Sequence, residues 1–323
     1  MAATAVAGDA SAIARAKARN AVLQDRAFHL LTLACAVLVV VLLLAVMVSL
    51  IVGAWPALQT FGIGFLGSSS WNPPKELFGA LPPIYGTIVT SIIAMVIGIP
   101  VSFGIAIFLT ELCPTVLRRP IGIAIELLAG IPSIIYGLWG FFFLAPFLQK
   151  TIQPALINSL GKIPGLGLLF GGPAYGIGLL TAGIILAIMV LPFITSITRD
   201  VFSTVPTLLR ESAYGMGMTT WEVSRSIVIP YTRVGLVGGV MLGLGRALGE
   251  TMAVTFVIGN SHKIVASILA PATTISATIA NEFTEATGDI YTSSLIALGL
   301  ILFIITFAVL AVAKWLLVHT AVK

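Results

Sequence analysis

Six long apolar runs constrain this chain more than any other feature. They cover about residues 30–52, 85–110, 121–147, 174–197, 234–258 and 293–316, and segments rich in Gly, Pro and charge separate them. An α-helix needs about 20 apolar residues to cross the hydrocarbon core of a bilayer. Because lipid offers no partner for backbone N–H and C=O groups, a crossing segment of this length must be helical. The sequence therefore predicts an all-α membrane protein with six transmembrane helices.

Composition argues against a soluble fold. Of the 323 residues, 58% are hydrophobic and 9% are charged, whereas soluble domains carry about 25% charged residues. The first run is longer than the apolar part of a signal peptide and no small-residue cleavage site follows it, so we expect it to remain. Cys35 and Cys113 lack metal-ligand spacing, and we interpret both as packing residues, with no disulfide and no metal site.

The basic residues predict the orientation. If the N-terminus is cytoplasmic, the inside segments hold Arg15, Lys17, Arg19, Arg26, Arg118, Arg119, Arg199, Arg210, Arg225, Arg233, Lys314 and Lys323. The outside segments then hold Lys75, Lys150, Lys162 and Lys263. The positive-inside rule places both termini in the cytoplasm, and this distribution also argues against nucleic-acid binding. Residues 1–29 form an arm that we interpret as a topology anchor, with contact to anionic lipid as the alternative.

The cytoplasmic segment 204–232 is predicted to form two short helices. Pro206 suits a first helical turn, and Leu208, Leu209, Ala213 and Met216 give one apolar face. Gly215 and Gly217 then end the first helix. Thr219 and Glu222 have the spacing of a capping box that begins a second helix, and we expect Pro230 to interrupt it before the next span. This shape favours docking to a partner, with an ordinary interfacial loop as the alternative.

The spacing in this loop resembles the EAA loop of ABC importer permeases. That signature is E-A-A, three residues, G, nine residues and I-x-L-P. The matching positions here are Glu211, Ser212, Ala213, Gly217, Ile227, Ile229 and Pro230. Ser212 and Ile229 depart conservatively. The resemblance implies a type I importer-like bundle in which this loop is the coupling helix that contacts a separate ATP-hydrolysing subunit.

The chain itself lacks the phosphate-binding loop of an ATPase. Gly161-Lys162 is followed by Ile163, and no glycine stands at the required upstream offset. We therefore predict a non-enzymatic subunit that binds no cofactor, with ATP and Mg²⁺ used by the partner.

Two charged residues fall inside the fifth run. Arg246 and Glu250 are four residues apart, which on a helix places them on one face and allows an ion pair. Charges at this depth normally face a bundle interior or an aqueous path. A planar guanidinium can donate two hydrogen bonds to a tetrahedral oxyanion. We interpret the pair as part of an anion pathway, the alternative being a self-neutralising packing pair. Nearby Gly243, Gly245 and Gly249 would leave room for close helix approach or for an ion to pass the backbone.

The third run carries Glu126 and an expected helix break. Glu126 lies near the cytoplasmic end, where snorkelling or pairing with Arg118 or Arg119 is favoured over a pathway role. Residues 130–133, Gly-Ile-Pro-Ser, should interrupt the helix and free backbone groups that need protein or water partners. Ser133 and Tyr136 could then supply hydroxyl groups to the substrate path, although a simple kink explains the break equally well.

Residues 126–140, 245–254 and 86–111 resemble the PstC-type permeases of ABC phosphate importers in the bacterial inner membrane. The resemblance extends over nearly the whole chain from about residue 30, so that 30–323 is the permease domain. It implies a second permease of the PstA type, a homodimeric ATPase and an extracytoplasmic phosphate-binding protein. It also implies that Arg246 and Glu250 take part in phosphate passage. Topology alone suggests that the outer segment from Pro56 to Pro83, with Trp55 and Trp71, meets the binding protein.

Other functions remain open to sequence reasoning. One arginine and a few hydroxyl groups would suit sulfate almost as well as phosphate. An ion-coupled secondary anion transporter would use Glu250 or Glu126 as a titrating group, but no internal repeat supports it. A scaffold or signalling subunit fits poorly with an arginine inside a span. Alternating access driven by a partner ATPase is the mechanism that we expect.

Overall fold

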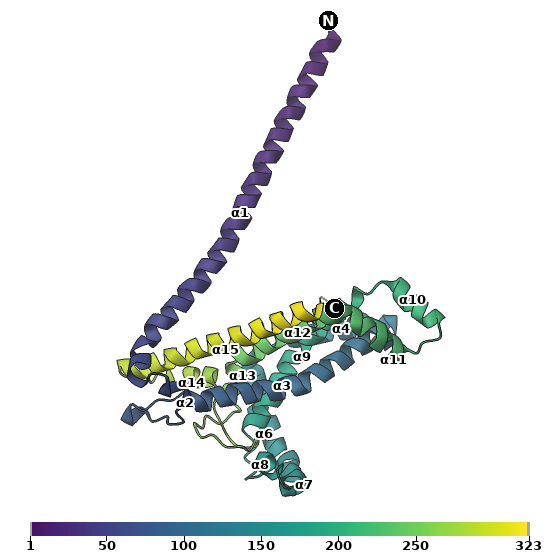
Figure 1. Cartoon of the computed structure of the whole chain (residues 1–323). Coiled ribbons are helices and arrows are strands. Elements are labelled where there is room, and N and C mark those ends of the chain that lie inside the picture. The colour runs from purple at the N-terminus through teal and green to yellow at the C-terminus, as the bar shows by residue number, and fades with distance from the viewer. Residues whose placement is uncertain (1, 322–323) are drawn as a thin grey trace. The chain divides into compact units, whose positions relative to one another are not determined.

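The computed structural model describes the backbone of residues 2–321 and the side chains of residues 24–315. Two compact units make up the chain, residues 1–53 and 54–323. The helical elements, shown in Figure 1, are α1 (Ala2–Phe61), α2 (Gly64–Gly67), η1 (Pro73–Lys75), α3 (Leu81–Ile107), η2 (Phe108–Leu112), α4 (Thr115–Ala129), α5 (Ser133–Trp139), η3 (Gly140–Leu144), α6 (Ala145–Phe147), η4 (Leu148–Ile152), α7 (Gln153–Ser159), η5 (Leu160–Lys162), α8 (Gly167–Phe170), α9 (Leu179–Ser203), α10 (Thr207–Gly215), α11 (Thr220–Val223), η6 (Ser224–Val228), α12 (Ile229–Gly249), α13 (Met252–Thr255), α14 (Ile275–Glu282) and α15 (Asp289–Ala321). Among the described residues there is no β-strand, only one isolated bridge between Asn72 and Leu77.

The predicted spans agree with the helices except at two places. Five helical stretches are long and apolar enough to cross a membrane: Gln24–Phe61, Leu81–Leu112, Leu179–Ser203, Thr220–Gly249 and Asp289–Trp315. The bent pair Thr115–Ala129 and Ser133–Lys162 becomes the sixth if it is counted as one span. We expected the fifth span to end near residue 258, but its helix ends at Gly249. The apolar residues that follow form α13 and pack inside the protein, where Ala253 is 0% exposed and Val254 is 1% exposed.

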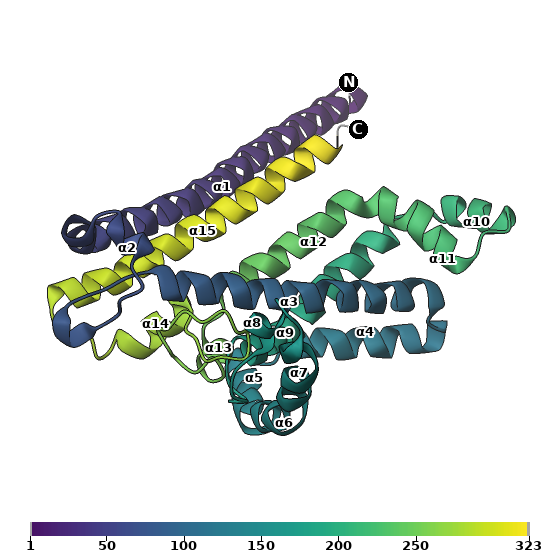
Figure 2. The same cartoon turned by 60° about the horizontal axis from the view of Figure 1, so that its bottom comes forward.

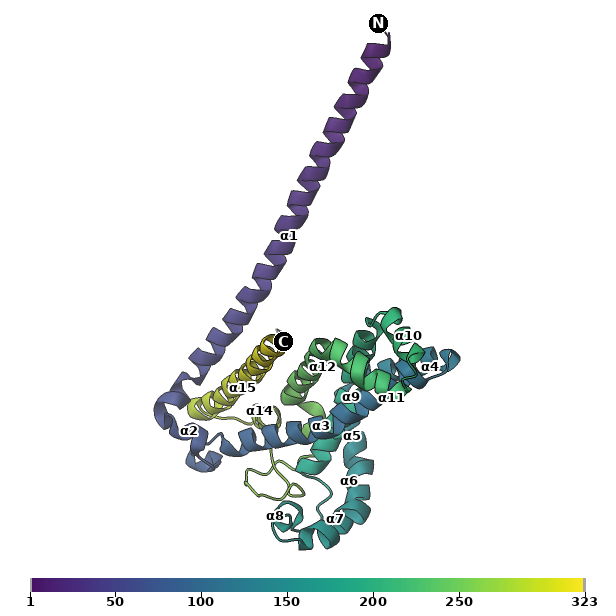
Figure 3. The same cartoon turned by 45° about the vertical axis from the view of Figure 1, so that its right-hand side comes forward.

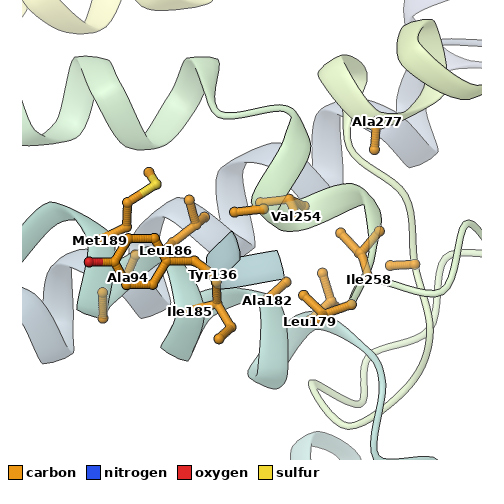
Figure 4. Close-up of a cluster of buried hydrophobic side chains, with 14 residues drawn as sticks. Ala94, Tyr136, Leu179, Ala182, Ile185, Leu186, Met189, Val254, Ile258 and Ala277 are labelled. Carbon is orange, nitrogen blue, oxygen red and sulfur yellow. The ribbon is translucent and has the colours of Figure 1, made fainter. Parts of the chain in front are cut away.

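Helix α9 is the centre of the second unit. It packs against α3, α4 and α12, and in its most apolar stretch 61% of the residues are buried, against 33% in α3. A cluster of buried side chains joins α9 to α3, α5 and α13 (Figure 4). Leu186 and Met189 of α9 lie beside the ring of Tyr136 in that cluster. Packing of this helix therefore fixes the elements that carry the candidate site.

Three glycines bring α12 close to α9. A Cβ atom at Gly235, Gly239 or Gly243 would lie 2.6 to 2.9 Å from a side chain of α9. These residues are four apart, so they form one stripe along α12 that lets the two backbones approach, as small residues do between membrane helices. We expected close helix approach or room for an ion at Gly243, Gly245 and Gly249, and within this chain Gly243 makes a close approach. The others have nothing nearer than 3.9 Å at Gly245 and nothing within 4 Å at Gly249.

The predicted break in the third span is present. Helix α4 ends at Ala129, α5 begins at Ser133, and their axes differ by 88°. Pro132 lacks an N–H and starts α5 in an extended conformation, with φ −56° and ψ 136°. The Tyr136 hydroxyl donates a hydrogen bond of 2.8 Å to the carbonyl of Leu128. The same carbonyl accepts a 3.3 Å hydrogen bond from the Ile131 N–H, so the tyrosine adds a side-chain contact across the break.

The functional elements lie at one end of the second unit. Helices α10 and α11 lie near the start of α4, whereas α2 and α14 lie at the opposite end (Figures 2 and 3). The first end is the one that the basic residues assign to the cytoplasm, an assignment that stays a prediction. The side chains of residues 1–23 lie outside the described residues, and so does any lipid contact made by Arg15, Lys17 and Arg19.

Candidate functional site: the coupling loop and the Arg246 region

The loop after α9 forms a helix, a glycine turn and a helix, as predicted. Helix α10 begins after Pro206 and ends at Gly215. Gly217 then adopts φ +85°, a left-handed conformation that glycine enters without steric cost. The capping box of α11 is complete, because Glu222 accepts a 2.7 Å hydrogen bond from the Thr219 backbone N–H while the Thr219 hydroxyl accepts one of 3.4 Å from the Glu222 N–H. Local sequence signals therefore determine the shape of this loop.

One side of the loop is anchored and the other is open. Ala213 and Val223 are 0% exposed and pack with Phe202 at the end of α9. Two other apolar residues, Met216 and Trp221, are 75% and 62% exposed. The apolar face that we predicted on α10 is therefore divided: Ala213 faces the bundle, while Leu208, Leu209 and Met216 face outward. An exposed apolar patch of this kind suits a partner protein.

Pro230 does not interrupt the second helix, contrary to our expectation. The stretch Thr220–Gly249 is continuous, and a π-helical turn, η6 (Ser224–Val228), connects α11 to α12. The wider turn accommodates the proline at the start of α12, where a missing N–H costs little. Ile227 packs against the anchored side of the loop. A motion of α10 and α11 would therefore pass into α12 through unbroken helix.

A buried ion pair joins the loop to the end of α3. Arg210 Nη2 lies 3.3 Å from Oε1 of Glu111, and the two side chains are 20% and 5% exposed. Arg210 also donates a 2.6 Å hydrogen bond to the carbonyl of Phe202. Glu111 Oε1 has no hydrogen-bond partner among the described residues, so the contact is an ion pair without hydrogen-bond alignment. Sequence reasoning missed this pair. The available signal was two opposite charges in segments that topology places on the same side of the membrane.

The predicted ion pair between Arg246 and Glu250 is not formed. Arg246 lies in the last turn of α12, but the helix ends at Gly249 and Glu250 is extended, with φ −70° and ψ 129°. A spacing of four residues gives a shared face only within one helix, so the break separates the two charges. Glu250 Oε1 instead accepts a 3.4 Å hydrogen bond from the N–H of Ala253 in α13. In the part of the chain with described side chains, no carboxylate lies within 4.0 Å of the Arg246 guanidinium.

Arg246 packs on an aromatic ring. Its guanidinium carbon lies 4.2 Å from the ring centroid of Phe193 in α9, a cation–π contact. Its Nε atom is buried and has no hydrogen-bond partner among the described residues. Arg246 is therefore half-buried with an unused Nε–H group, and a guanidinium of this kind is suited to donating hydrogen bonds to an anion.

The other hydroxyl groups contribute less than we predicted. Tyr136 donates its only phenolic proton to Leu128, so in this conformation it cannot donate to an anion. A hollow of about 300 Å³ beside it is lined by Ile131, Ile135, Tyr136, Trp139 and Ile188. That lining is apolar apart from the tyrosine and offers no anion-binding group. Ser133, the first residue of α5, is half-buried at the bend.

Glu126 pairs with a different arginine from those we predicted. Its Oε1 lies 2.8 Å from Nη2 of Arg199 in α9, not beside Arg118 or Arg119. Arg118 instead donates a 2.9 Å hydrogen bond to the carbonyl of Thr110. The prediction failed because it considered only neighbours in sequence, whereas the packing of α4 on α9 supplies a partner 73 residues away.

At the opposite end, Trp71 forms part of a buried cluster. Its indole N–H donates a 2.8 Å hydrogen bond to Glu282, and its ring stacks on His262 at 5.0 Å. His262 Nε2 and the Tyr291 hydroxyl also contact Glu282, at 2.8 and 2.6 Å. Burial by itself would raise the pKa of Glu282, but hydrogen bonds from His262, Tyr291 and Trp71 outweigh it, and the pKa lies below the usual value. Trp71 thus connects the segment before α3 to α14 and to the loop that precedes it, while Trp55 is 55% exposed.

The described residues hold no group of three or more His, Cys, Asp or Glu side chains that could bind a metal ion. Cys35 and Cys113 are free thiols, and Cys113 is buried.

These features define a class of protein. Several helices have membrane-spanning length, two of them, α3 and α12, pack on α9, an exposed helix–turn–helix projects from one end, and a half-buried arginine lies on α12. This combination is that of a transmembrane transport subunit.

Comparison with known proteins agrees with a transmembrane transport subunit and identifies its family. Residues 98–319 match the family model of the binding-protein-dependent transport system inner membrane component. The phosphate transport system permease protein PstC of Mesorhizobium japonicum is 68% identical over 94% of this chain and 93% of its own length. That of Pasteurella multocida is 56% identical over 89% and 90%. The chain belongs to this inner-membrane family and, within it, to the PstC phosphate transport system permeases.

A solved structure confirms the fold. A chain of the inward-facing MetNI methionine ABC transporter superposes with a TM-score of 0.57 over 77% of this chain and 99% of that one, at 16% identity. The predicted importer-type permease bundle is therefore correct, as is the multi-pass inner-membrane location.

Proposed function

We propose that this chain is the permease subunit that moves inorganic phosphate across the cytoplasmic membrane, driven by a partner ATPase through alternating access. The observation that carries the substrate is the 68% identity to a permease whose name states phosphate transport. The unpaired guanidinium of Arg246 supports it, since a fixed positive charge lowers the cost of an anion inside the membrane. Ser133 lies at the bend on the same path in this proposal, and Tyr136 holds the bend in place.

The proposed partners follow from the loop. Glu211, Ser212, Ala213 and Gly217 would seat in a groove of a homodimeric ATP-binding subunit, and Ile227 and Pro230 would carry the movement into α12. The exposed side chains of Leu208, Met216 and Trp221 support this, because an exposed apolar patch is typical of a protein–protein interface. ATP and Mg²⁺ are used by that subunit. A second permease of the PstA type and an extracytoplasmic phosphate-binding protein complete the complex.

In the proposed cycle, ATP binding closes the ATPase dimer and pulls α10 and α11. The Arg210–Glu111 pair passes the movement to α3, and the continuous helix from Thr220 passes it to α12. The bundle then opens outward and receives phosphate, and hydrolysis resets it. Arg246 attracts the anion with a single positive charge. Because one charge binds the anion less tightly than two would, the anion can leave again.

The test is reconstitution of the purified chain with its proposed partners in vesicles. We expect phosphate uptake to require both ATP and the ATPase. We expect no comparable uptake when sulfate is supplied in place of phosphate. Uptake that persists without any ATPase, driven by an ion gradient, would contradict the proposed energy source. ATP-driven uptake of sulfate at the same rate would contradict the substrate.

A further inference from the structure

A basic pocket lies between the start of α4 and the end of α9. It has a volume of about 320 Å³ and is lined by Thr115, Arg118, Arg119, Gly122, Ile123, Glu126 and Arg199. Three of these residues are cationic and one is anionic. The transport pathway described above does not include this pocket, because Arg246 and Phe193 lie elsewhere along α9 and α12.

The arginines of this pocket are held in place by the fold. Arg199 reaches over α4 because Gly122 has no side chain, and a Cβ atom there would lie 2.9 Å from Arg199 Nη1. Glu126 at 2.8 Å and Asp200 at 3.0 Å fix the guanidinium. Arg118 is fixed by its hydrogen bond to the Thr110 carbonyl. Both side chains keep further N–H groups for a ligand, because each guanidinium carries five.

Arg119 is the free cation of the pocket. It is exposed, and within the described part of the chain it makes no hydrogen bond or ion pair. The pocket also adjoins the first turn of α4, which follows Pro114 and has no capping side chain. The N–H groups of that turn add positive potential to the charge of the arginines.

The surroundings of the pocket are apolar. Val116 and Leu127 on α4 are 81% and 68% exposed, and Ile123 lines the pocket itself. A helix end with arginines beside exposed aliphatic side chains matches a molecule that has a charged head and an acyl chain. Basic pockets between helices at the cytoplasmic end of membrane proteins bind anionic headgroups.

We propose that this pocket binds the phosphate group of an anionic phospholipid. Arg119, which is unpaired, turns to contact the phosphate, and Arg118 and Arg199, which the fold holds in place, donate further hydrogen bonds to it. The recognised chemistry is a phosphate group whose negative charge is not neutralised by a cationic group on the same headgroup. A lipid headgroup and free inorganic phosphate share that chemistry, and the apolar flank favours the lipid.

The test uses the purified full chain in neutral detergent, with lipid binding counted by native mass spectrometry. We expect short-chain phosphatidylglycerol to bind and phosphatidylcholine not to bind. Arg119→Gln should weaken phosphatidylglycerol binding about fivefold, which corresponds to roughly 1 kcal/mol for one basic residue near a membrane. Because Arg119 is exposed and unpaired, the variant should fold normally.

Arg233→Gln is the matched control. Arg233 is an exposed arginine on α12, at the same end of the bundle but outside the pocket, and its loss should leave binding unchanged. Equal losses in both variants, or no loss in Arg119→Gln, would overturn the pocket assignment. If inorganic phosphate binds the wild type and is lost in Arg119→Gln while phosphatidylglycerol binds neither, the ligand is free phosphate and the lipid assignment is wrong.

Discussion

Two arginines inside the same bundle are held in opposite ways. Arg210 is tied to Glu111 by an ion pair and to the Phe202 carbonyl by a hydrogen bond. Arg246 rests on the ring of Phe193, and the carboxylate four residues later in the chain has turned away from it. The charge of Arg210 is therefore paired within the protein, whereas the charge of Arg246 has no carboxylate partner and can interact with a ligand.

The difference matches two tasks. A locked pair between α10 and η2 resists separation, so it can transmit a displacement of the loop to α3. A charge without a fixed counterion can attract an anion and release it, because no ion pair must break first. On the proposed function, the chain would separate force transmission from anion contact and would use an arginine for both.

The largest expected effect is on the locked pair. Arg210→Gln leaves the Glu111 carboxylate 5% exposed and without its cation, and breaking a buried pair in this way costs about 3–5 kcal/mol. We expect amide hydrogen exchange across Thr207–Val223 to accelerate about 100-fold or more. Hydrogen exchange with mass spectrometry on the full chain measures this.

Arg225→Gln is the control for that experiment. Arg225 is an exposed arginine in η6, and its removal should change stability by less than about 0.5 kcal/mol. The double variant Glu111→Gln with Arg210→Gln should recover part of the protection, because no buried charge is left alone. Unchanged exchange in Arg210→Gln would mean that the pair does not hold the loop.

The available arginine should affect transport rather than stability. On the proposed function, Arg246→Gln would remove two charge-assisted hydrogen bonds to a passing phosphate, so kcat/KM for uptake should fall about 100-fold or more. Arg246→Lys keeps the charge without the planar fork, and we expect a loss of about tenfold. Uptake assays in vesicles measure both variants, and co-purification of the ATPase should be unchanged. Wild-type uptake by Arg246→Gln would remove Arg246 from the pathway.

Substitutions at Gly217, in the turn between α10 and α11, test whether the loop that carries Arg210 depends on its backbone conformation. Gly217 has φ +85°, and a Cβ atom added to it would meet nothing within 4 Å. Space is therefore not the reason for glycine here, whereas the left-handed conformation alone costs other residues about 1–2 kcal/mol. Gly217→Leu should lower phosphate-coupled ATP hydrolysis about 5- to 30-fold, as measured with the reconstituted complex. Gly217→Asn should lose less, since Asn tolerates this conformation.

Gly215→Ala provides the matched control for the turn. Gly215 ends α10 without a positive φ and has nothing within 4 Å of its Cβ position, so coupling should be preserved. If Gly217→Asn is as harmful as Gly217→Leu, contact with the ATPase surface, not backbone conformation, determines the requirement for glycine.

The sequence predicted the parts of this fold that depend on local signals. Apolar runs indicated the spans, Pro132 indicated the break between α4 and α5, and the Thr219–Glu222 capping box indicated the start of α11. Each of these depends on residues within a few positions of one another, which is the range over which backbone preferences act.

The parts that failed depend on distant contacts. Glu126 finds Arg199 and Glu111 finds Arg210 only because α4, α9 and α10 pack together. The end of the fifth span was misplaced because the apolar residues after Glu250 are buried in protein rather than in lipid. Hydrophobicity alone cannot separate those two environments.

The smallest expected effect distinguishes the predicted pair from the observed geometry. If Glu250 held Arg246, Glu250→Gln would free the arginine and alter uptake strongly. In the structure Glu250 instead accepts a hydrogen bond of 3.4 Å from the Ala253 N–H, a contact that glutamine can also make. Uptake by Glu250→Gln should therefore stay within about fivefold of wild type, the range of a weak charge interaction. A loss as large as that of Arg246→Gln would show that the two side chains pair in another state of the transport cycle, and Arg246 would then resemble Arg210 in requiring a partner.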